Sequence, residues 1–206
     1  FKKIMNLTKS QNEALNKIEN FINSDEHIFL LKGGAGTGKT TIIREIIKII
    51  LKNEKTLSIS APTGRAVSII SKILNNSNVY LSSPKVMSTI HSMIYRYQSL
   101  NIIDQKNIEN SDTFNFNFIL KNNDDSINHV YIIDEASMIG NNKSESEFLR
   151  FGSGKLLSDL IDYSECVEPN NNKKIIFIGD DSQLPPVDNN NENIISPALS
   201  ANYLKS

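Results

Sequence analysis

Residues Gly33 to Thr40 read Gly-Gly-Ala-Gly-Thr-Gly-Lys-Thr, which is the pattern of a phosphate-binding loop. Glycines let successive N–H groups turn toward phosphate oxygens, and the helix that follows such a loop adds the positive end of its dipole. Lys39 is expected to reach the β- and γ-phosphates, and the Thr40 hydroxyl to ligate Mg²⁺. The sequence therefore predicts a nucleoside triphosphate site formed by Gly33, Gly34, Ala35, Gly36, Thr37, Gly38, Lys39, Thr40 and Thr41.

The segments on either side of this loop have the character that such a loop requires. The run from His27 to Lys32 is apolar and typical of a buried strand, and the run from Thr41 to Leu51 has apolar residues at helical spacing. An ordinary glycine-rich turn would not need a strand before it and a helix after it. The flanking segments favour the nucleotide-binding interpretation.

Length and charge set limits on the class of protein. The 206 residues suffice for one well-buried domain with a small insertion, and 22 basic against 23 acidic residues give a net charge of −1. Any basic surface must therefore be local. The single cysteine, Cys166, fits a reducing compartment, and no apolar run is long enough to span a membrane, so we expect a cytoplasmic protein. The N-terminus does not have the pattern of a signal peptide. Because the chain begins with Phe1 and not Met, we expect it to be a trimmed piece or to lack its first residues.

Predicted strands and helices alternate along the chain. Helices are expected over residues 7–21, 39–52, 66–74, 88–97 and 156–163, and strands over residues 28–31, 56–60, 130–133 and 174–178. Such alternation indicates an α/β fold in three layers, with a mostly parallel sheet between helices. Ligands of such folds bind at the carboxyl ends of the strands.

The segment from Gln98 to Asn128 differs from this pattern. It is polar and rich in asparagine, with two strand-like runs at 100–103 and 114–120. Phe114, Phe116 and Phe118 alternate with polar residues, which predicts a β-hairpin insertion with one buried face that carries the phenylalanines.

Two acidic residues, Asp134 and Glu135, follow directly after the apolar strand at 130–133. Adjacent carboxylates beside a buried strand are costly unless they have a function. Asp134 can hold Mg²⁺, and Glu135 can orient and deprotonate an attacking water. The alternative is a helix N-cap followed by an acid in the first turn.

A third group of polar residues follows the strand at 174–178, in the sequence Gly179-Asp-Asp-Ser-Gln-Leu-Pro-Pro-Val. The Gln183 amide can contact the γ-phosphate or the attacking water, and Pro185 and Pro186 stiffen the chain beyond it. A surface turn that ends in proline is the alternative.

Taken in order, these segments resemble the motifs of a known family. The phosphate loop, Ala61-Pro-Thr-Gly-Arg-Ala, Thr89-Ile-His, Ile133-Asp-Glu-Ala-Ser-Met and the segment from Gly179 to Val187 look like motifs I, Ia, Ib, II and III of superfamily 1 helicases, in the RecD-like branch (superfamily 1B). The resemblance extends from the N-terminal region to about residue 187. It implies a RecA-like P-loop NTPase domain, with ATP and Mg²⁺ as cofactors, that moves on single-stranded DNA in the 5′ to 3′ direction.

The resemblance also assigns roles to individual residues. Gln11 matches the upstream glutamine that reads the adenine edge, and Thr63, Arg65, Thr89 and His91 match residues that contact the DNA backbone. Hydroxyl and guanidinium groups suit phosphate contacts of this kind. The alternatives are helix caps for Thr63 and Thr89 and a structural histidine for His91.

The family places a strand-separating pin where the 98–128 insertion lies, so the insertion is either such a wedge or a plain surface insertion. Motifs IV to VI are not found in this sequence. The resemblance therefore implies a second RecA-like domain in a parent protein, which completes the ATP site with an arginine, and we expect the present chain alone to hydrolyse ATP very slowly.

Two other classes of function remain open from the sequence. A non-motor P-loop enzyme, such as a small-molecule kinase, would share the phosphate loop but would not need Glu135 and Gln183 to handle water. A nucleic-acid-binding module derived from a helicase would bind without turnover. Stimulation of ATP hydrolysis by single-stranded DNA would distinguish a motor from both.

Overall fold

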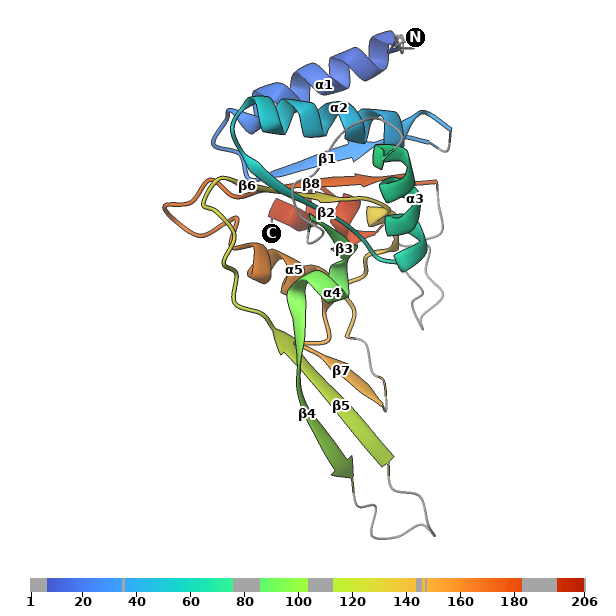
Figure 1. The fold of residues 1–206 in the computed structure, drawn as a ribbon, viewed down its shortest axis with the longest axis vertical. Helices are drawn as coiled ribbons and strands as arrows, with labels where there is room; N and C mark the ends of the chain where they lie inside the picture. Colours follow the sequence, from blue (N-terminus) through green and yellow to red (C-terminus); the bar gives the residue numbers. More distant parts are fainter. Residues whose placement is uncertain are drawn as a thin grey trace.

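The computed structural model describes residues 7–34, 36–75, 86–103, 113–143, 146, 148–182 and 196–205. Its main body is built on a five-stranded sheet with the strand order β1-β8-β6-β2-β3 (Figure 1). The neighbouring strands of this sheet pair in parallel. The bounds are β1 Ile28–Lys32, β2 Thr56–Ala61, β3 Met87–Thr89, β6 His129–Ile133 and β8 Lys174–Gly179. The predicted α/β fold with a mostly parallel sheet is confirmed.

Of the three inner strands, β6 and β8 are buried along their whole length, and β2 is buried at every residue except Thr56. A parallel strand that is covered by helices on both faces has no solvent-facing side, so its sequence is a continuous apolar run without alternation. This is why Val130-Tyr-Ile-Ile and Ile175-Ile-Phe-Ile could be predicted as strands.

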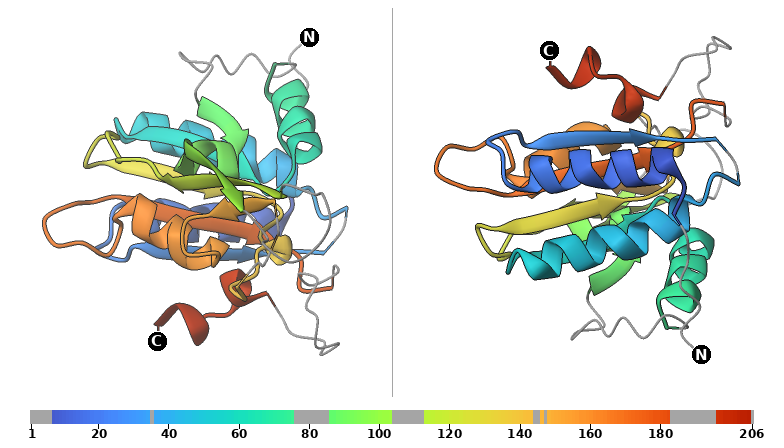
Figure 2. Two further views of the ribbon diagram at one scale, coloured as in Figure 1. Left: turned by 90° about the horizontal axis from the view of Figure 1, so that it is seen from below. Right: turned by 90° about the horizontal axis from the view of Figure 1, so that it is seen from above.

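Helices cover both faces of the sheet (Figure 2). On one face lie α1 (Lys9–Ile22), α2 (Lys39–Lys52) and α3 (Gly64–Asn75). On the other lie α4 (Ile90–Ile94), α5 (Leu156–Ser164) and the short 3₁₀ helix η3 (Pro197–Leu199), which pack against Tyr131 and Phe177. The result is the three-layer arrangement expected from the sequence.

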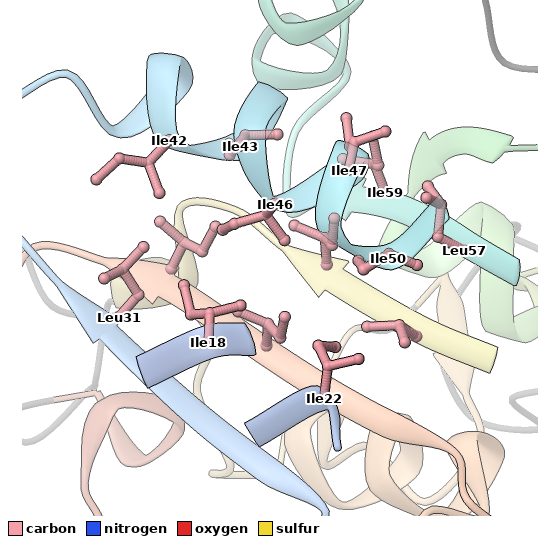
Figure 3. Packing of buried hydrophobic residues seen from close by; sticks show 14 of the residues in the cluster. Ile18, Ile22, Leu31, Ile42, Ile43, Ile46, Ile47, Ile50, Leu57 and Ile59 are labelled. Carbon is pink, nitrogen blue, oxygen red and sulfur yellow. The ribbon is translucent and has the colours of Figure 1, made fainter. Parts of the chain in front are cut away.

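The core on the first face is dominated by isoleucine from α2 (Figure 3). Five isoleucines of α2 at positions 42, 43, 46, 47 and 50 are each at most 6% exposed. Their i, i+3, i+4 spacing places them on one side of the helix. They meet Ile18 and Ile22 of α1 and the upper faces of β1, β2, β6 and β8. This packing fixes α2, and with it the loop that precedes α2, over the sheet.

A smaller three-stranded sheet projects from the main body (Figure 1). It consists of β4 (Tyr95–Ile103), β5 (Thr113–Leu120) and β7 (Leu149–Phe151). β4 and β5 form the predicted antiparallel pair, whereas β7, which was not predicted, adds to β5 in parallel.

The phenylalanines of β5 do not form the buried face that the alternation predicted. Phe114 and Phe116 are 44% and 41% exposed, whereas Asn115 on the opposite face is 3% exposed. Phe118 stacks on Phe151 at 4.7 Å because it lies at the base of the strand, close to the main body. The other two lie farther out, where β4 and β5 extend away from the helices (Figure 1). The strand was predicted correctly and its buried face incorrectly.

The helix predicted over residues 88–97 is also wrong in extent. Met87–Thr89 is a strand that pairs in parallel with β2, α4 covers only Ile90–Ile94, and Tyr95 already belongs to β4. Thr89 explains the start of α4, because its hydroxyl accepts a hydrogen bond from the Ser92 N–H at 3.2 Å.

The base of the small sheet is anchored by a buried polar contact. The Tyr95 hydroxyl of β4 donates a hydrogen bond of 2.6 Å to the Asp159 carboxylate of α5, which is 2% exposed. The Ser153 N–H donates to the same carboxylate at 3.0 Å. The segment around Gly152-Ser-Gly-Lys is therefore a turn that precedes α5, and it joins the small sheet to the main body.

Among the described residues, no helix combines the length and the apolar character that crossing a membrane would require.

A buried lysine anchors the amino-terminal end of β8 in the main sheet. Lys174, at the start of β8, is 2% exposed, and its ammonium group donates to the Ser24 carbonyl at 2.7 Å and to the Glu26 carbonyl. The same group lies 4.8 Å from the centre of the Phe21 ring. Burial lowers the pKa of Lys174. Lys174 thus links the turn after α1 to the start of β8.

We predict that Lys174→Met lowers the free energy of unfolding by about 1–3 kcal/mol, because two carbonyls in the partly buried turn after α1 lose their donor. Lys72→Met on the exposed side of α3 removes the same charge at the surface and should change stability by less than about 0.5 kcal/mol. Urea denaturation followed by circular dichroism measures both. Equal midpoints for the two variants would contradict this role of Lys174.

Candidate nucleotide-binding site

The glycine-rich loop connects the end of β1 to the start of α2, as expected for a phosphate-binding loop. Gly36 and Gly38 have φ angles of 75° and 83°, in the left-handed region that favours glycine. A Cβ atom on Gly38 would also lie 2.6 Å from the Gln11 amide nitrogen. Gly38 is the N-cap of α2, so the first N–H groups of this helix open toward the loop. The backbone conformation therefore suits an anion at this helix end.

Lys39, in the first turn of α2, points back into the loop. Its ammonium group donates to the Gly33 carbonyl at 2.6 Å and to the Gly34 carbonyl at 3.1 Å. The side chain is 19% exposed, and its ammonium nitrogen lies 3.6 Å from a carboxylate oxygen of Asp180. A cation is thus held inside the loop, where a phosphate group would need it.

Gln11 contacts the loop directly from α1. Its amide NH₂ donates to the Thr37 carbonyl at 2.8 Å, and its amide oxygen accepts from the Thr8 N–H at 2.9 Å. The Thr8 hydroxyl in turn accepts from the Gln11 N–H at 3.2 Å, which completes a capping box at the start of α1. Gln11 is therefore both a helix cap and a tether for the phosphate loop.

Asp134 and Glu135 follow β6, at the same edge of the sheet as the loop. The Asp134 N–H donates to the Ser60 carbonyl at 2.9 Å, which fixes the chain to the end of β2. Glu135 has a φ of 51°, in the left-handed region. It precedes the 3₁₀ helix η2 (Ala136–Met138) and makes no side-chain cap hydrogen bond to it. The alternative role as a helix cap is therefore not the role these acids have.

The charge of Asp134 is set by two opposing effects. Burial raises the pKa of this carboxyl, while a hydrogen bond from the Glu135 N–H and the positive charge of Lys39 lower it. The charge of Lys39 therefore acts on the pKa of Asp134, although the two residues lie on different elements. The strained backbone at Glu135 is typical of functional positions.

β8 brings a further pair of acids between the loop and Asp134. Asp180 is 3% exposed, and one of its oxygens accepts from the Ser182 N–H at 2.9 Å. That hydrogen bond and the nearby Lys39 lower the pKa of Asp180. The next residue, Asp181, points outward and pairs with Lys32 at 3.0 Å on the surface.

Gly179 allows the close packing of these elements. A Cβ atom on this residue would lie 2.7 Å from the Leu199 side chain and 3.1 Å from the Ser137 N–H of η2. Only glycine lets η2, which follows Asp134 and Glu135, approach the end of β8 this closely.

The residues expected to contact DNA lie beside the nucleotide residues, at the ends of β2 and β3. These two strands pair with Ala61 opposite Thr89. The Thr63 hydroxyl accepts from the Ala66 N–H at 3.2 Å, and the Thr89 hydroxyl accepts from the Ser92 N–H at the same distance. Both threonines are therefore helix caps in this structure, which was the alternative considered for them.

Arg65 and His91 differ in their exposure to solvent. Arg65 is exposed at the start of α3. The His91 ring packs edge-on against Phe151 at 4.9 Å and lies 5.6 Å from the Tyr95 ring. Burial lowers the pKa of His91, which favours the neutral ring near pH 7. His91 therefore has the environment of a structural histidine, whereas Arg65 presents its charge to solvent.

Some predicted site residues lie outside what the structure describes. Ala35 and Gln183 are outside the described residues, and of Thr40 only the backbone is described, in α2. Thr41 is half-buried in the first turn of α2.

One residue of the site was not singled out from the sequence. Asp180 belongs to the polar run after β8, in which the sequence pattern pointed to Gln183. The signal was the position itself: an acid directly after a buried strand, as at Asp134. Its partner Lys39 could not be known before the strand order placed β8 next to β1.

Comparison with known proteins agrees with this geometry. Residues 11–189 match the family model described as an AAA domain. The chain is 35% identical over 188 residues to the RecBCD enzyme subunit RecD of Buchnera aphidicola subsp. Schizaphis graminum, which covers 88% of this chain and 27% of that protein. It is 33% identical over 107 residues to the ATP-dependent DNA helicase dda of Enterobacteria phage T4, which covers 50% of this chain and 22% of that protein.

A solved structure of DNA unwinding at forked double-stranded DNA by two coordinating Pif1 helicases is also similar. It superposes with a TM-score of 0.52 at 25% identity, over 91% of this chain and 37% of the Pif1 chain. The present chain thus spans only part of these relatives: 27% of the RecD subunit, 22% of the dda helicase and 37% of the Pif1 chain. The chain belongs to the AAA-domain family, and it has the RecA-like motor-domain fold of RecD-like superfamily 1 helicases.

Proposed function

We propose that this chain is the nucleotide-binding motor domain of an ATP-dependent DNA helicase, which couples ATP hydrolysis to 5′ to 3′ movement on single-stranded DNA. The observation that carries the proposal is that the loop with Lys39, Asp180 and Asp134 follow the carboxyl ends of β1, β8 and β6, three neighbouring parallel strands, with Lys39 3.6 Å from Asp180. Ligands of open α/β sheets bind at this edge. The helicase activity itself is drawn from the relatives RecD, dda and Pif1.

ATP binds along the loop from Gly33 to Thr41 in this proposal. The N–H groups at the start of α2 and the Lys39 ammonium receive the phosphates, and the Thr40 hydroxyl and Asp134 hold Mg²⁺. The residues present fit this cofactor pair, because the N-terminus of α2 has no side-chain cap, the Lys39 ammonium lies within the loop, and Asp134 is a carboxylate at the same edge of the sheet. Mg²⁺ supplies positive charge to the phosphate oxygens when bound.

Glu135 is the general base in this proposal. It orients the water that attacks the terminal phosphate and accepts a proton from it. Its side chain makes no hydrogen bond that would cap η2, so the carboxylate does not serve to stabilise that helix. Gln183 follows β8 closely in sequence and is proposed to report whether the terminal phosphate is present.

Gln11 is proposed to contact the adenine base, as its match to the upstream glutamine implies. Its amide is already bonded to the Thr37 carbonyl and the Thr8 N–H. Recognition of the base and the conformation of the phosphate loop therefore share one side chain.

The DNA-contacting surface is proposed at the ends of β2 and β3. Arg65 is the member of the predicted set best placed for a phosphate contact, because it is exposed. Thr63 and Thr89 cap α3 and α4 as acceptors, and each hydroxyl keeps its own O–H to donate to a phosphate oxygen. His91 of α4, whose ring packs against Phe151, is proposed to contact the DNA backbone as well.

The projecting sheet of β4, β5 and β7 is proposed as the strand-separating wedge. Leu100, Phe116 and Leu149 are paired across its three strands and are each 41–42% exposed. Residues 95–103, 113–121 and 149–151 contain the cations Arg96, Lys121 and Arg150 and no acidic residue. Apolar side chains can intrude between bases, and cations attract the phosphate backbone. A second RecA-like domain in a parent protein is proposed to complete the ATP site.

We predict that Lys39→Ala weakens binding of Mg·ADP by about tenfold or more, because the cation of the loop is lost. Lys32→Ala is the matched control, since Lys32 lies next to the loop but pairs with Asp181 at the surface. Isothermal titration calorimetry on the 206-residue chain measures both. Equal affinity of the two variants would refute the assignment of the phosphate site.

We predict that Glu135→Gln lowers the rate of ATP hydrolysis about 100-fold or more while Mg·ATP binding is retained, because the amide cannot accept a proton. Release of radiolabelled phosphate under single-turnover conditions, with the chain in excess over ATP, measures the rate even where turnover is slow. Hydrolysis at the wild-type rate would exclude Glu135 as the base.

For the wedge, we predict that Phe116→Ser weakens binding of a forked DNA about fivefold or more, because an aromatic contact with bases contributes about 1–3 kcal/mol. Leu51→Ser on α2, where the leucine is 48% exposed, removes an exposed apolar residue from another surface and should leave the affinity unchanged. Fluorescence anisotropy of labelled DNA measures the affinities. If Phe116→Ser binds as well as Leu51→Ser, the small sheet is a plain surface insertion.

A further inference from the structure

Asp180 occupies a position that none of the proposed catalytic steps uses. β8 lies between β1 and β6, and its register places Gly179 opposite Lys32. The ladder continues by one bond into the loop, because the Gly33 N–H donates to the Gly179 carbonyl at 3.0 Å. The next side chain along β8, that of Asp180, is therefore at the beginning of the phosphate loop, and it is 4% exposed.

The Lys39 ammonium has three N–H donors, and three oxygens of the protein lie around it. Two are the carbonyl oxygens of Gly33 and Gly34, at 2.6 and 3.1 Å. The third is the Asp180 carboxylate at 3.6 Å, the only one of the three that carries a charge. The contact with Asp180 is an ion pair and not a hydrogen bond, so a phosphate that binds Lys39 meets the negative charge of Asp180 beside it.

Asp180 is held in position independently of Lys39. Its other oxygen accepts from the Ser182 N–H at 2.9 Å, and this bond together with Lys39 lowers the pKa of the carboxyl. The carboxylate is thus a fixed negative charge beside the place that the phosphates take. Asp181, by contrast, is part of an exposed pair with Lys32.

We propose that Asp180 is a positioning residue that competes with the nucleotide phosphates for Lys39. Its carboxylate keeps the ammonium inside the loop and offers it an alternative partner when a phosphate leaves, so it weakens binding of the di- and triphosphate and favours release of the product. This inference rests on the proposed nucleotide site and adds a residue to it that acts through Lys39.

The test uses Asp180→Asn, which keeps the size of the side chain and the acceptor for the Ser182 N–H but removes the charge. Without the competing carboxylate, the affinity for ADP should rise about threefold or more, because two charges at contact distance interact strongly in a partly buried site. The affinity for AMP should stay within twofold, because Lys39 serves the β- and γ-phosphates. Isothermal titration calorimetry with ADP and with AMP gives both values on the 206-residue chain.

Two further variants separate charge from structure. Asp181→Asn removes the same charge one residue away and should leave the ADP affinity within twofold of wild type. Asp180→Glu keeps the charge and should bind ADP nearly as weakly as wild type. Thermal unfolding of each variant without nucleotide shows whether it is folded before the titration.

Tighter ADP binding by Asp180→Asn alone, with AMP unchanged, supports the competition. ADP binding that is unchanged or weaker in Asp180→Asn overturns it, as does an equal gain for AMP. Failure of the nucleotide site itself has a different signature, because ADP affinity would then be insensitive to Lys39→Ala.

Discussion

The hydrogen-bond ladder between β1 and β8 is the constraint on which the site depends. It runs in register from Ile28 opposite Ile175 to Lys32 opposite Gly179, and one further bond joins Gly33 to Gly179. Because the strands are parallel, both carboxyl ends lie at one edge of the sheet. The loop that follows β1 and the acids that follow β8 must therefore meet. A register shift of one residue would move Asp180 away from the loop and turn its side chain to the other face.

The rest of the site is fixed to this ladder by packing on both faces. The isoleucines of α2 hold the helix that follows the loop against the sheet, as shown in Figure 3, while Gly179 lets η2 approach the end of β8. Gln11 adds a contact from α1. The phosphate loop is thus positioned by three elements, namely α1, α2 and β8. An arrangement fixed in this way keeps its donors oriented before a ligand binds, which is what stabilisation of phosphate charge requires.

Those elements could be predicted whose pattern of apolar residues alone identifies them as a strand or a helix. Buried parallel strands are continuous apolar runs, so β6 and β8 were predicted to within a residue at each end. Prediction failed where tertiary position overrides the local pattern. The alternation in β5 is real, but a sequence does not reveal that Phe116 lies beyond the helices that could cover it. The three-residue strand β3 is too short to show a period at all.

For the site, the types of residue could be predicted from the sequence, whereas their partners are seen only in the structure. Lys39, Asp134 and Glu135 could be named because a loop, a strand and their spacing suffice to identify them. The pairing of Lys39 with Asp180 depends on a strand order that no local pattern contains, since 141 residues separate the two in the chain. The same holds for Gln11, whose bond to Thr37 bridges α1 and the loop. Contacts between distant segments, such as these two, are thus harder to predict than the residue types of a phosphate-binding loop, because no local pattern contains them.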